Sequence, residues 1–250
     1  MRILLVNDDG YTSAGIRDLA KALTKQHEVL VVAPHKCNSG MAHAMTFYKS
    51  LYLKKIENPS DGYDCYSFTG TPADCVKVGT ELMIDNPPDL IISGINTEPN
   101  IGTAVAYSGT AHSAMEGSIL GYKSIAISSN PEKDEDYAYI VDFFIKNLDF
   151  YISLCTPDYA LNINVNNERI GNKGHKICPL GARLYTDEYI IGEEDENGIP
   201  YTLVGDPIPV DNPIDCDVNW FEGGYATISP IACNYTSLDA LASLKEMVSE

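Results

Sequence analysis

The first turn of the chain carries two adjacent carboxylates, Asp8 and Asp9, directly after a short apolar run. Residues 2–6 (RILLV) have the length and composition of a buried strand, and the Asn-Asp-Asp-Gly that follows is a turn signal. Ligands of open α/β sheets bind outside the carboxyl ends of the strands. Paired carboxylates there suit a hard cation, since Mg²⁺ is usually held by one or two carboxylates, waters and a substrate phosphate. The alternative is that the pair only shapes the turn or caps the next helix.

Two later apolar runs end in polar residues that would face the same crevice. Residues 28–33 (EVLVVA) predict a second strand, and Ser39 lies on the loop behind it. Residues 89–93 predict another strand, which opens into Asn96. Because strand, helix and strand alternate from the start of the chain, the pattern predicts a parallel sheet whose carboxyl ends meet at one edge. Taken alone, Ser39 before Gly40 would be interpreted as an ordinary loop residue with no ligand role.

The tripeptide Ser108-Gly109-Thr110 is predicted to begin a helix and to form a phosphate cradle. A helix start offers free N–H groups and a positive dipole end to an anion. The alternative is an ordinary Ser or Thr N-cap. The tripeptide is not a Walker A loop, because no Gly-Lys-Ser/Thr is present. The absence of G-x-G-x-x-G after the first strand also disfavours a dinucleotide-dependent dehydrogenase.

The remaining pattern predicts an α/β fold with a Rossmann-like, doubly wound and mostly parallel sheet. A late hairpin with an acidic tip suggests an oligomerisation arm, followed by a C-terminal helix. The other predicted elements are a helix at 16–23, a strand pair within 44–69, a helix from 72 to about 84 with Thr71 and Asp74 as its capping box, strands at 124–128 and 161–165, a helix at 137–148, a hairpin at 188–205 with its tip at 193–198, and a helix from 236.

Composition narrows the functional classes. Hydrophobic residues make up 44% and charged residues 21%, the balance of an ordinary soluble globular protein. The net charge of −18 would repel a nucleic-acid backbone. No run approaches the ~20 apolar residues of a membrane helix and the start lacks a signal-peptide layout, so a cytoplasmic protein with no membrane partner is predicted. Seven scattered cysteines without a C-x-x-C pair predict reduced thiols.

In their order along the chain, these motifs resemble the SurE (survival protein E) family of metal-dependent nucleotidases. The resemblance spans nearly the whole sequence. The matching motifs are 6–10 (VNDDG), 38–40 (NSG), 70–76 (GTPADCV), 93–96 (SGIN), 107–110 (YSGT), 116–117 (EG), 161–165 (LNINV), 224–225 (GY) and 228–230 (ISP).

The resemblance implies one α/β domain over residues 1–250 and a homodimer or homotetramer. Its core would comprise about 1–167 plus 226–235, with the hairpin arm and C-terminal extension at about 168–225 and 236–250. It also implies hydrolysis of nucleoside 5′-monophosphates to nucleoside and phosphate, with 3′-monophosphates and short polyphosphate as further substrates in the family.

The resemblance further implies one divalent cation per subunit, held by Asp8, Asp9, Ser39 and Asn96. The all-oxygen set suits Mg²⁺ or Mn²⁺ and, less well, Ca²⁺. Asp8 and Asp9 are the catalytic candidates, one of them orienting or deprotonating a water. A covalent phospho-aspartate is the mechanistic rival. The expected phosphate-binding residues are Asn7, Gly40, Ser108, Gly109 and Thr110.

The sequence also departs from the family pattern. Thr97-Glu98-Pro99 follows Asn96 where the family usually has a small residue and a glycine, and Cys37 and Asn38 replace polar or basic residues before Ser39. The first departure bears on substrate preference and the second on phosphate contacts. A nucleotide-binding module without hydrolysis and a nucleotide-sugar transferase are the alternative functions.

Overall fold

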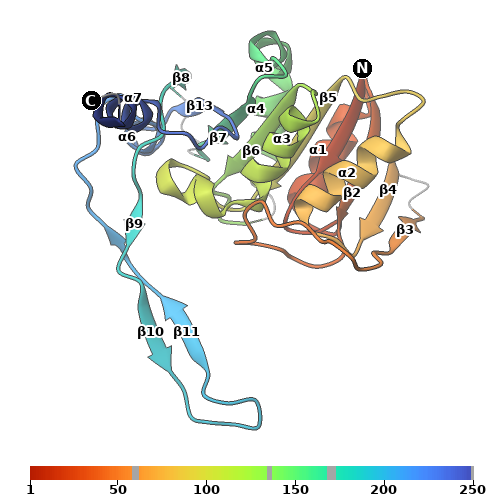
Figure 1. Cartoon of the computed structure of the whole chain (residues 1–250). Helices are drawn as coiled ribbons and strands as arrows, with labels where there is room; N and C mark the ends of the chain where they lie inside the picture. The colour runs from red at the N-terminus through yellow and green to blue at the C-terminus, as the bar shows by residue number, and fades with distance from the viewer. Residues whose placement is uncertain (58–61, 134–136, 168–172, 249–250) are drawn as a thin grey trace.

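The structure is a computed structural model that describes residues 1–57, 62–133, 137–167 and 173–248. The strands of its central sheet are β1 Arg2–Val6, β2 Glu28–Pro34, β3 Leu53–Ile56, β4 Asp64–Phe68, β5 Leu90–Asn96, β6 Ser124–Ser129, β7 Ala160–Val165, β8 His175–Ile177 and β13 Ala226–Ile231. Their order across the sheet is β3-β4-β2-β1-β5-β6-β7-β13-β8 (Figure 1). All neighbouring strands from β4 to β7 run parallel, which confirms the predicted α/β fold.

The strand order reverses at β1. This strand pairs with β2 on one side and with β5 on the other, and both pairs are parallel. The chain therefore winds outward from β1 in both directions, which makes the carboxyl ends of β1 and β5 a topological switch point. Asp8 follows β1 and Asn96 ends β5, so the fold brings these two predicted site residues to the same crevice.

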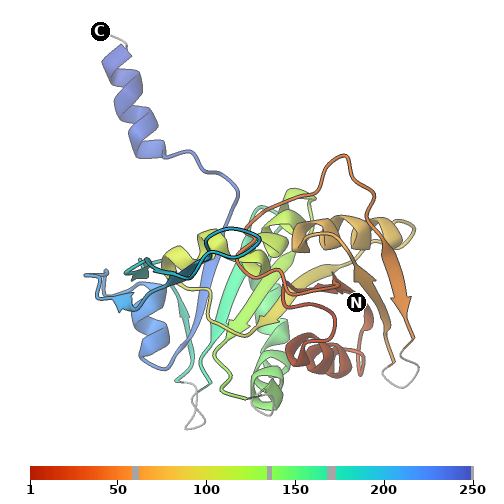
Figure 2. The same ribbon diagram turned by 90° about the horizontal axis from the view of Figure 1, so that it is seen from below.

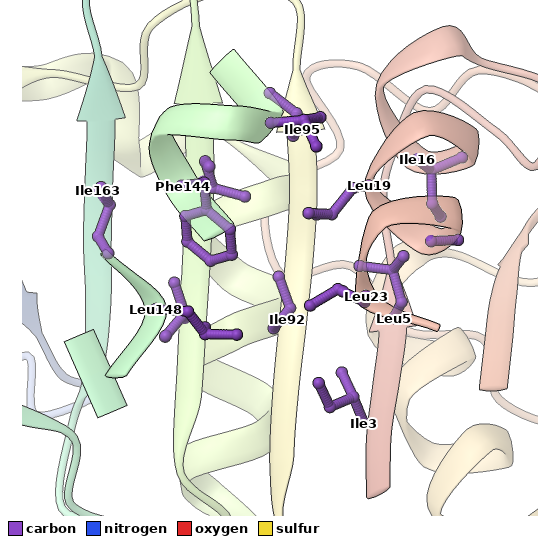
Figure 3. Close-up of a cluster of buried hydrophobic side chains, with 14 of the residues drawn as sticks. Ile3, Leu5, Ile16, Leu19, Leu23, Ile92, Ile95, Phe144, Leu148 and Ile163 are labelled. Carbon is purple, nitrogen blue, oxygen red and sulfur yellow. The ribbon is translucent and has the colours of Figure 1, made fainter. Parts of the chain in front are cut away.

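Helices cover both faces of the sheet. They are α1 Ala14–Leu23, α2 Pro72–Leu82, α3 Gly109–Ile119, α4 Tyr137–Lys146 and α5 Leu148–Leu154. Helices α2 and α3 lie on one face, and α1, α4 and α5 lie on the other (Figure 1). The second face holds the larger core, in which Leu19 of α1, Phe144 of α4 and Ile92 of β5 belong to one buried cluster (Figure 3). Each such buried side chain contributes about 1.5–3 kcal/mol, so this face keeps the sheet rigid behind the crevice.

Three local predictions have different outcomes. The capping box of α2 is confirmed, with Thr71 and Asp74 bonded to each other's backbone N–H. The strand pair within 44–69 is confirmed as antiparallel β3 and β4, and residues 58–61 of its connection lie outside the described residues. The single helix predicted at 137–148 is wrong. The helix is interrupted at Asn147, whose side-chain amide donates to the Phe143 carbonyl, and α5 begins at the next residue.

The hairpin arm extends away from the sheet. Its strands pair as β9 Leu184–Tyr185 with β12 Pro207–Ile208 and, farther out, as β10 Glu188–Ile191 with β11 Tyr201–Val204. Asp195 and Gly198 form a bridge within the predicted tip. Figure 1 shows the hairpin reaching far from the body, and Figure 2 shows helix α7 (Leu238–Val248) also standing off it. None of the described helices has the length and apolar character that crossing a membrane requires.

Two further elements were not indicated by the sequence pattern. They are the 3-10 helix η1 Gly102–Tyr107 and helix α6 Asp217–Glu222. Strand β13 also joins the sheet antiparallel to β7, so the sheet is mixed at this edge. All seven cysteines are free thiols, as the sequence predicts.

Candidate metal and phosphate site

Asp8 sits in the turn after β1 with its carboxylate against the first turn of α3. The Thr110 backbone N–H donates to Oδ2 at 3.1 Å, and the Thr110 hydroxyl donates to Oδ1 at 2.5 Å. Gly109 leaves room for this contact, because a Cβ there would lie 2.8 Å from the Cβ of Asp8. Burial raises the pKa of Asp8, and hydrogen bonds from Thr110 and Gly109 oppose that rise. The positive end of α3 therefore holds the Asp8 carboxylate in place.

Asp9 lies beside Asp8 and has a different environment. It is partly buried, and its buried Oδ2 has no hydrogen-bond partner among the described residues. Burial and then the Asp8 charge raise the pKa of Asp9 to about 6, while the Thr97 backbone N–H lowers it and the Glu98 charge adds to the rise. A buried carboxylate oxygen without a donor is costly. A bound cation would remove that cost, so this oxygen fits a metal ligand.

Asn96 reaches the crevice because β5 departs from regular pairing just before it. The register between β5 and β6 shifts between Ser93 and Asn96. Gly94 makes this possible, since it has φ +137° and an added Cβ would lie 2.2 Å from the Ile127 carbonyl oxygen. The Asn96 amide N–H donates to the Glu98 carbonyl at 2.7 Å, which leaves the side-chain oxygen for another partner. Asn96 therefore presents a neutral oxygen.

Ser39 is carried by a loop that is fixed on both sides of it. The Asn38 backbone N–H donates to the Asp8 carbonyl at 2.7 Å, and the Ala42 backbone N–H donates to the Tyr107 carbonyl at 3.0 Å. Farther along the same loop, His43 contacts the buried Glu116 carboxylate of α3 at 2.8 Å. Ser39 itself is exposed between these anchors. The loop thus brings a hydroxyl to the site, while its anchors limit how far Ser39 moves.

Five of the predicted residues line one cleft of about 390 Å³, a volume within the size range of small-molecule sites. The described residues hold no cluster of three or more His, Cys, Asp or Glu side chains arranged for a metal, so a cation here depends on neutral oxygens as well as carboxylates. Asp9 is not part of the described lining, but its carboxylate accepts a hydrogen bond from the backbone of Thr97, which is. The lining residues are Asp8, Ser39, Gly40, Asn96, Thr97, Glu98, Pro99, Asn100, Thr103, Ala104, Tyr107, Ser108, Arg183 and Tyr185.

Three of the residues predicted to contact phosphate have other partners within the fold. Thr110 gives its amide and its hydroxyl to Asp8, and Gly109 packs against the same carboxylate, so both position Asp8. The Asn7 side chain is fully buried and bonds to Gly10 and Ser13, so it shapes the turn. The α3 start is still an anion site, but its anion is a side chain of the same protein.

Gly40 and Ser108 stay candidates for phosphate contacts. Both line the cleft. Ser108 Oγ accepts the Ala111 backbone N–H at 3.0 Å as the N-cap of α3. Its hydroxyl hydrogen is not used in that bond, because the oxygen acts as acceptor. Gly40 has φ +75° and nothing within 4 Å of an added Cβ, so its backbone faces open space.

Arg183 and Tyr185 line the cleft but were not predicted as site residues. They lie at the base of the hairpin arm, about 75 residues beyond the last predicted site motif. The acidic, turn-rich stretch around them indicated a surface arm, and a lone Arg carries no sequence signal for a cleft. Only the tertiary fold brings this segment to the site.

Comparison with known proteins identifies the family. A sequence profile described as survival protein SurE matches residues 3–187. The chain belongs to the SurE family. It is 39% identical over 250 residues to a protein named 5′-nucleotidase SurE from Pseudothermotoga lettingae, covering 99% of this chain and 95% of the relative. A second 5′-nucleotidase SurE, from Clostridium beijerinckii, is 38% identical over 257 residues and covers 99% of both chains.

The SurE fold is also found in a solved relative. A crystal structure titled SurE protein from Aquifex aeolicus is 35% identical, covers 99% of both chains and superimposes with a TM-score of 0.78. SurE relatives thus match from end to end, including the residues that form the hairpin arm. The predicted family resemblance is confirmed.

Proposed function

We propose that this chain is a divalent-metal-dependent 5′-nucleotidase that hydrolyses nucleoside 5′-monophosphates to nucleoside and phosphate. The observation that carries the proposal is the unpartnered buried oxygen of Asp9, next to Asp8, which lines a cleft together with Ser39 and Asn96. Two carboxylates and two neutral oxygens match the ligand preference of Mg²⁺ and Mn²⁺. The names of the SurE relatives support the same reaction.

The two carboxylates have separate roles in this proposal. Asp8 is held by Thr110 on both oxygens and serves as a fixed anionic ligand. Asp9 would bind the cation through the oxygen without a partner, and we also assign its carboxylate to orient the attacking water and accept its proton. When bound, the cation would offset the phosphate charge and make the water easier to deprotonate. Gly40 N–H and the Ser108 hydroxyl would donate to the remaining phosphate oxygens.

Phosphate release tests the proposal directly. With Mg²⁺ or Mn²⁺ present, the protein is expected to release inorganic phosphate from AMP or GMP without any acceptor sugar. EDTA should abolish the release and added metal should restore it, because two close carboxylates without a cation repel the substrate phosphate. A nucleotide-binding module would bind AMP without releasing phosphate, and a transferase would need an acceptor. Undiminished hydrolysis in EDTA would contradict the metal dependence.

We further propose that the arm and the C-terminal helix join copies of this chain into a dimer or tetramer. The apolar side chains Tyr189, Ile190, Ile191 and Tyr201 on the outer hairpin are each 60% exposed. Leu238, Leu244 and Met247 of α7 are exposed as well. Apolar surface of this kind on elements that stand off the body is typical of a protein interface.

Light scattering measures the assembly. The purified chain is expected to show the mass of two or four copies of the 27.3 kDa chain. Replacing Ile190 and Ile191 together by Ser should lower that mass if the hairpin forms the contact, since hydroxyls in an apolar interface remove burial and add a desolvation cost. A monomeric wild-type protein would contradict the proposal.

A further inference from the structure

The base of the hairpin arm forms one wall of the cleft next to Asp8. Arg183 and Tyr185 both line it, and the Cζ of Arg183 lies 5.6 Å from the centre of the Tyr185 ring. Arg183 is the basic side chain of the described lining, which also holds the acids Asp8 and Glu98. A guanidinium within cation–π range of a tyrosine ring places a cationic and an aromatic group side by side on the same wall.

The backbone that carries Arg183 is held to the core of the site. The Arg183 N–H donates to the Thr103 hydroxyl oxygen at 3.1 Å, and that hydroxyl donates to the Arg183 carbonyl. Just before it, the Gly181 N–H donates to the Asp217 carboxylate at 2.7 Å, and the Gly102 N–H donates to the same carboxylate at 2.8 Å.

These bonds fix the arm base against η1, which forms the neighbouring part of the wall. Asp217 is fully buried, and the N–H groups of Gly102, Gly181 and Val218 all point at it, so the joint is satisfied within the fold. The backbone of Arg183 is thus preorganised at the cleft although it belongs to a protruding segment. Preorganisation lowers the ordering cost of binding a ligand.

We infer that Arg183 and Tyr185 form the platform for the nucleobase of the substrate and set a preference for nucleotides over smaller phosphate monoesters. The inference rests on the proposed nucleotidase function and adds the residues that recognise the nucleoside part. Nucleobases stack on tyrosine rings and on guanidinium planes. Stacking tolerates every base, because each has a π face. Purine and pyrimidine nucleotides are therefore both accepted, with the larger purine ring gaining more contact.

Adenosine separates base recognition from phosphate and metal binding, because it carries no phosphate. The experiment is an NMR titration of adenosine into the full-length protein without metal, alongside phosphate release from AMP and from ribose 5-phosphate with Mg²⁺. Arg183→Ala and Tyr185→Ala are each expected to weaken adenosine binding about tenfold, the scale of one lost stacking contact. Both should raise the KM for AMP by a similar factor, with kcat nearly unchanged and with ribose 5-phosphate hydrolysis unaffected.

Two variants serve as controls. Tyr185→Phe keeps the ring and should retain adenosine binding. Arg17→Ala removes an exposed charge on α1 that is not part of the cleft lining, and it should change nothing. Equal losses for AMP and ribose 5-phosphate in Arg183→Ala would overturn the inference, since they would make Arg183 a phosphate contact. Wild-type adenosine affinity in both alanine variants would overturn it too. If the alanine variants bind adenosine more weakly but the wild-type protein releases no phosphate from AMP, the platform is supported and the proposed function is contradicted.

Discussion

Replacing Asp9 with Asn is expected to lower phosphate release from AMP about a thousandfold or more. The substitution keeps the size of the side chain but removes the charge of the oxygen that has no partner in the fold. Losses of this size follow the removal of one group that stabilises charge in a transition state. Asp8→Asn should be similarly inactive, because it removes the ligand that Thr110 holds. Steady-state phosphate release at saturating Mg²⁺ measures both.

The same Asp9→Asn variant should fold at least as stably as the wild type when metal is absent. The pKa of Asp9 lies at about 6 in the folded protein, above its ordinary 3.8. The folded state then holds a proton that the unfolded state has lost, so stability falls as pH rises from about 4 through 6. Asn has no charge to bury, so it avoids this loss of stability. The free energy of unfolding of Asp9→Asn at about pH 8 is therefore expected to exceed that of the wild type by about 1–2 kcal/mol after allowance for solvent screening. The gain should vanish below about pH 4, where Asp is neutral in both states.

Thermal unfolding in EDTA at the two pH values measures this gain. Asp85→Asn is a matched control, because Asp85 is exposed after α2 at the opposite edge of the sheet. It should change neither activity nor thermal stability. Near-normal turnover in both the Asp8 and Asp9 variants at saturating metal would contradict the proposed metal site.

Substituting Gly94 by Ala is expected to lower the free energy of unfolding by about 3 kcal/mol or more. The added Cβ would lie 2.2 Å from the Ile127 carbonyl oxygen and 2.8 Å from the Ile127 side chain. The backbone at φ +137° is also one that side chains rarely adopt. Both strands are central in the sheet, so relief requires β5 and β6 to separate, and overpacking of this kind is costly.

Gly121 provides the control for Gly94. It also has a positive φ, +86°, but an added Cβ there meets nothing within 4 Å. Gly121→Ala should therefore cost only the backbone strain, about 1 kcal/mol. Urea unfolding of the metal-free proteins compares the two. Equal losses would show that contact with Ile127 is not what requires glycine at this position.

Gly94→Ala should also impair the site. Asn96 reaches the crevice through the register shift that begins beside Gly94. A displaced β5 would move the Asn96 oxygen relative to Asp8 and Asp9. Metal affinity is therefore expected to fall along with stability, which calorimetric titration of Mg²⁺ into the folded fraction measures.

Local sequence patterns were sufficient for most of the fold. Helix α1 buries Ile16, Leu19 and Leu23 at the spacing that predicted it, and the Thr71 cap of α2 forms the predicted box. Such features depend on residues within one or two turns of each other, so the order of residues alone specifies them. The break at Asn147 was missed because the apolar periodicity continues across it.

The meeting of Asp8, Ser39 and Asn96 at one cleft was likewise predictable, because parallel strands end at one edge and ligand-type oxygens follow three of those ends. What the start of α3 binds was not predictable. The N–H groups at a free helix start attract any anion. In the fold, the Asp8 carboxylate accepts hydrogen bonds from the Thr110 N–H and hydroxyl, which were predicted to contact phosphate. This arrangement depends on the contact between Asp8 and Thr110, which are 102 positions apart in the sequence.

The sequence by itself determined the α/β sheet, the polar strand ends and the family, because these follow from periodicity and from short motifs. The tertiary structure decided which oxygen of the acidic pair is left without a partner, and it brought Arg183 to the cleft through Thr103 and Asp217. Those outcomes depend on burial and on long-range packing, which set the electrostatic cost of each group and have no local sequence signature.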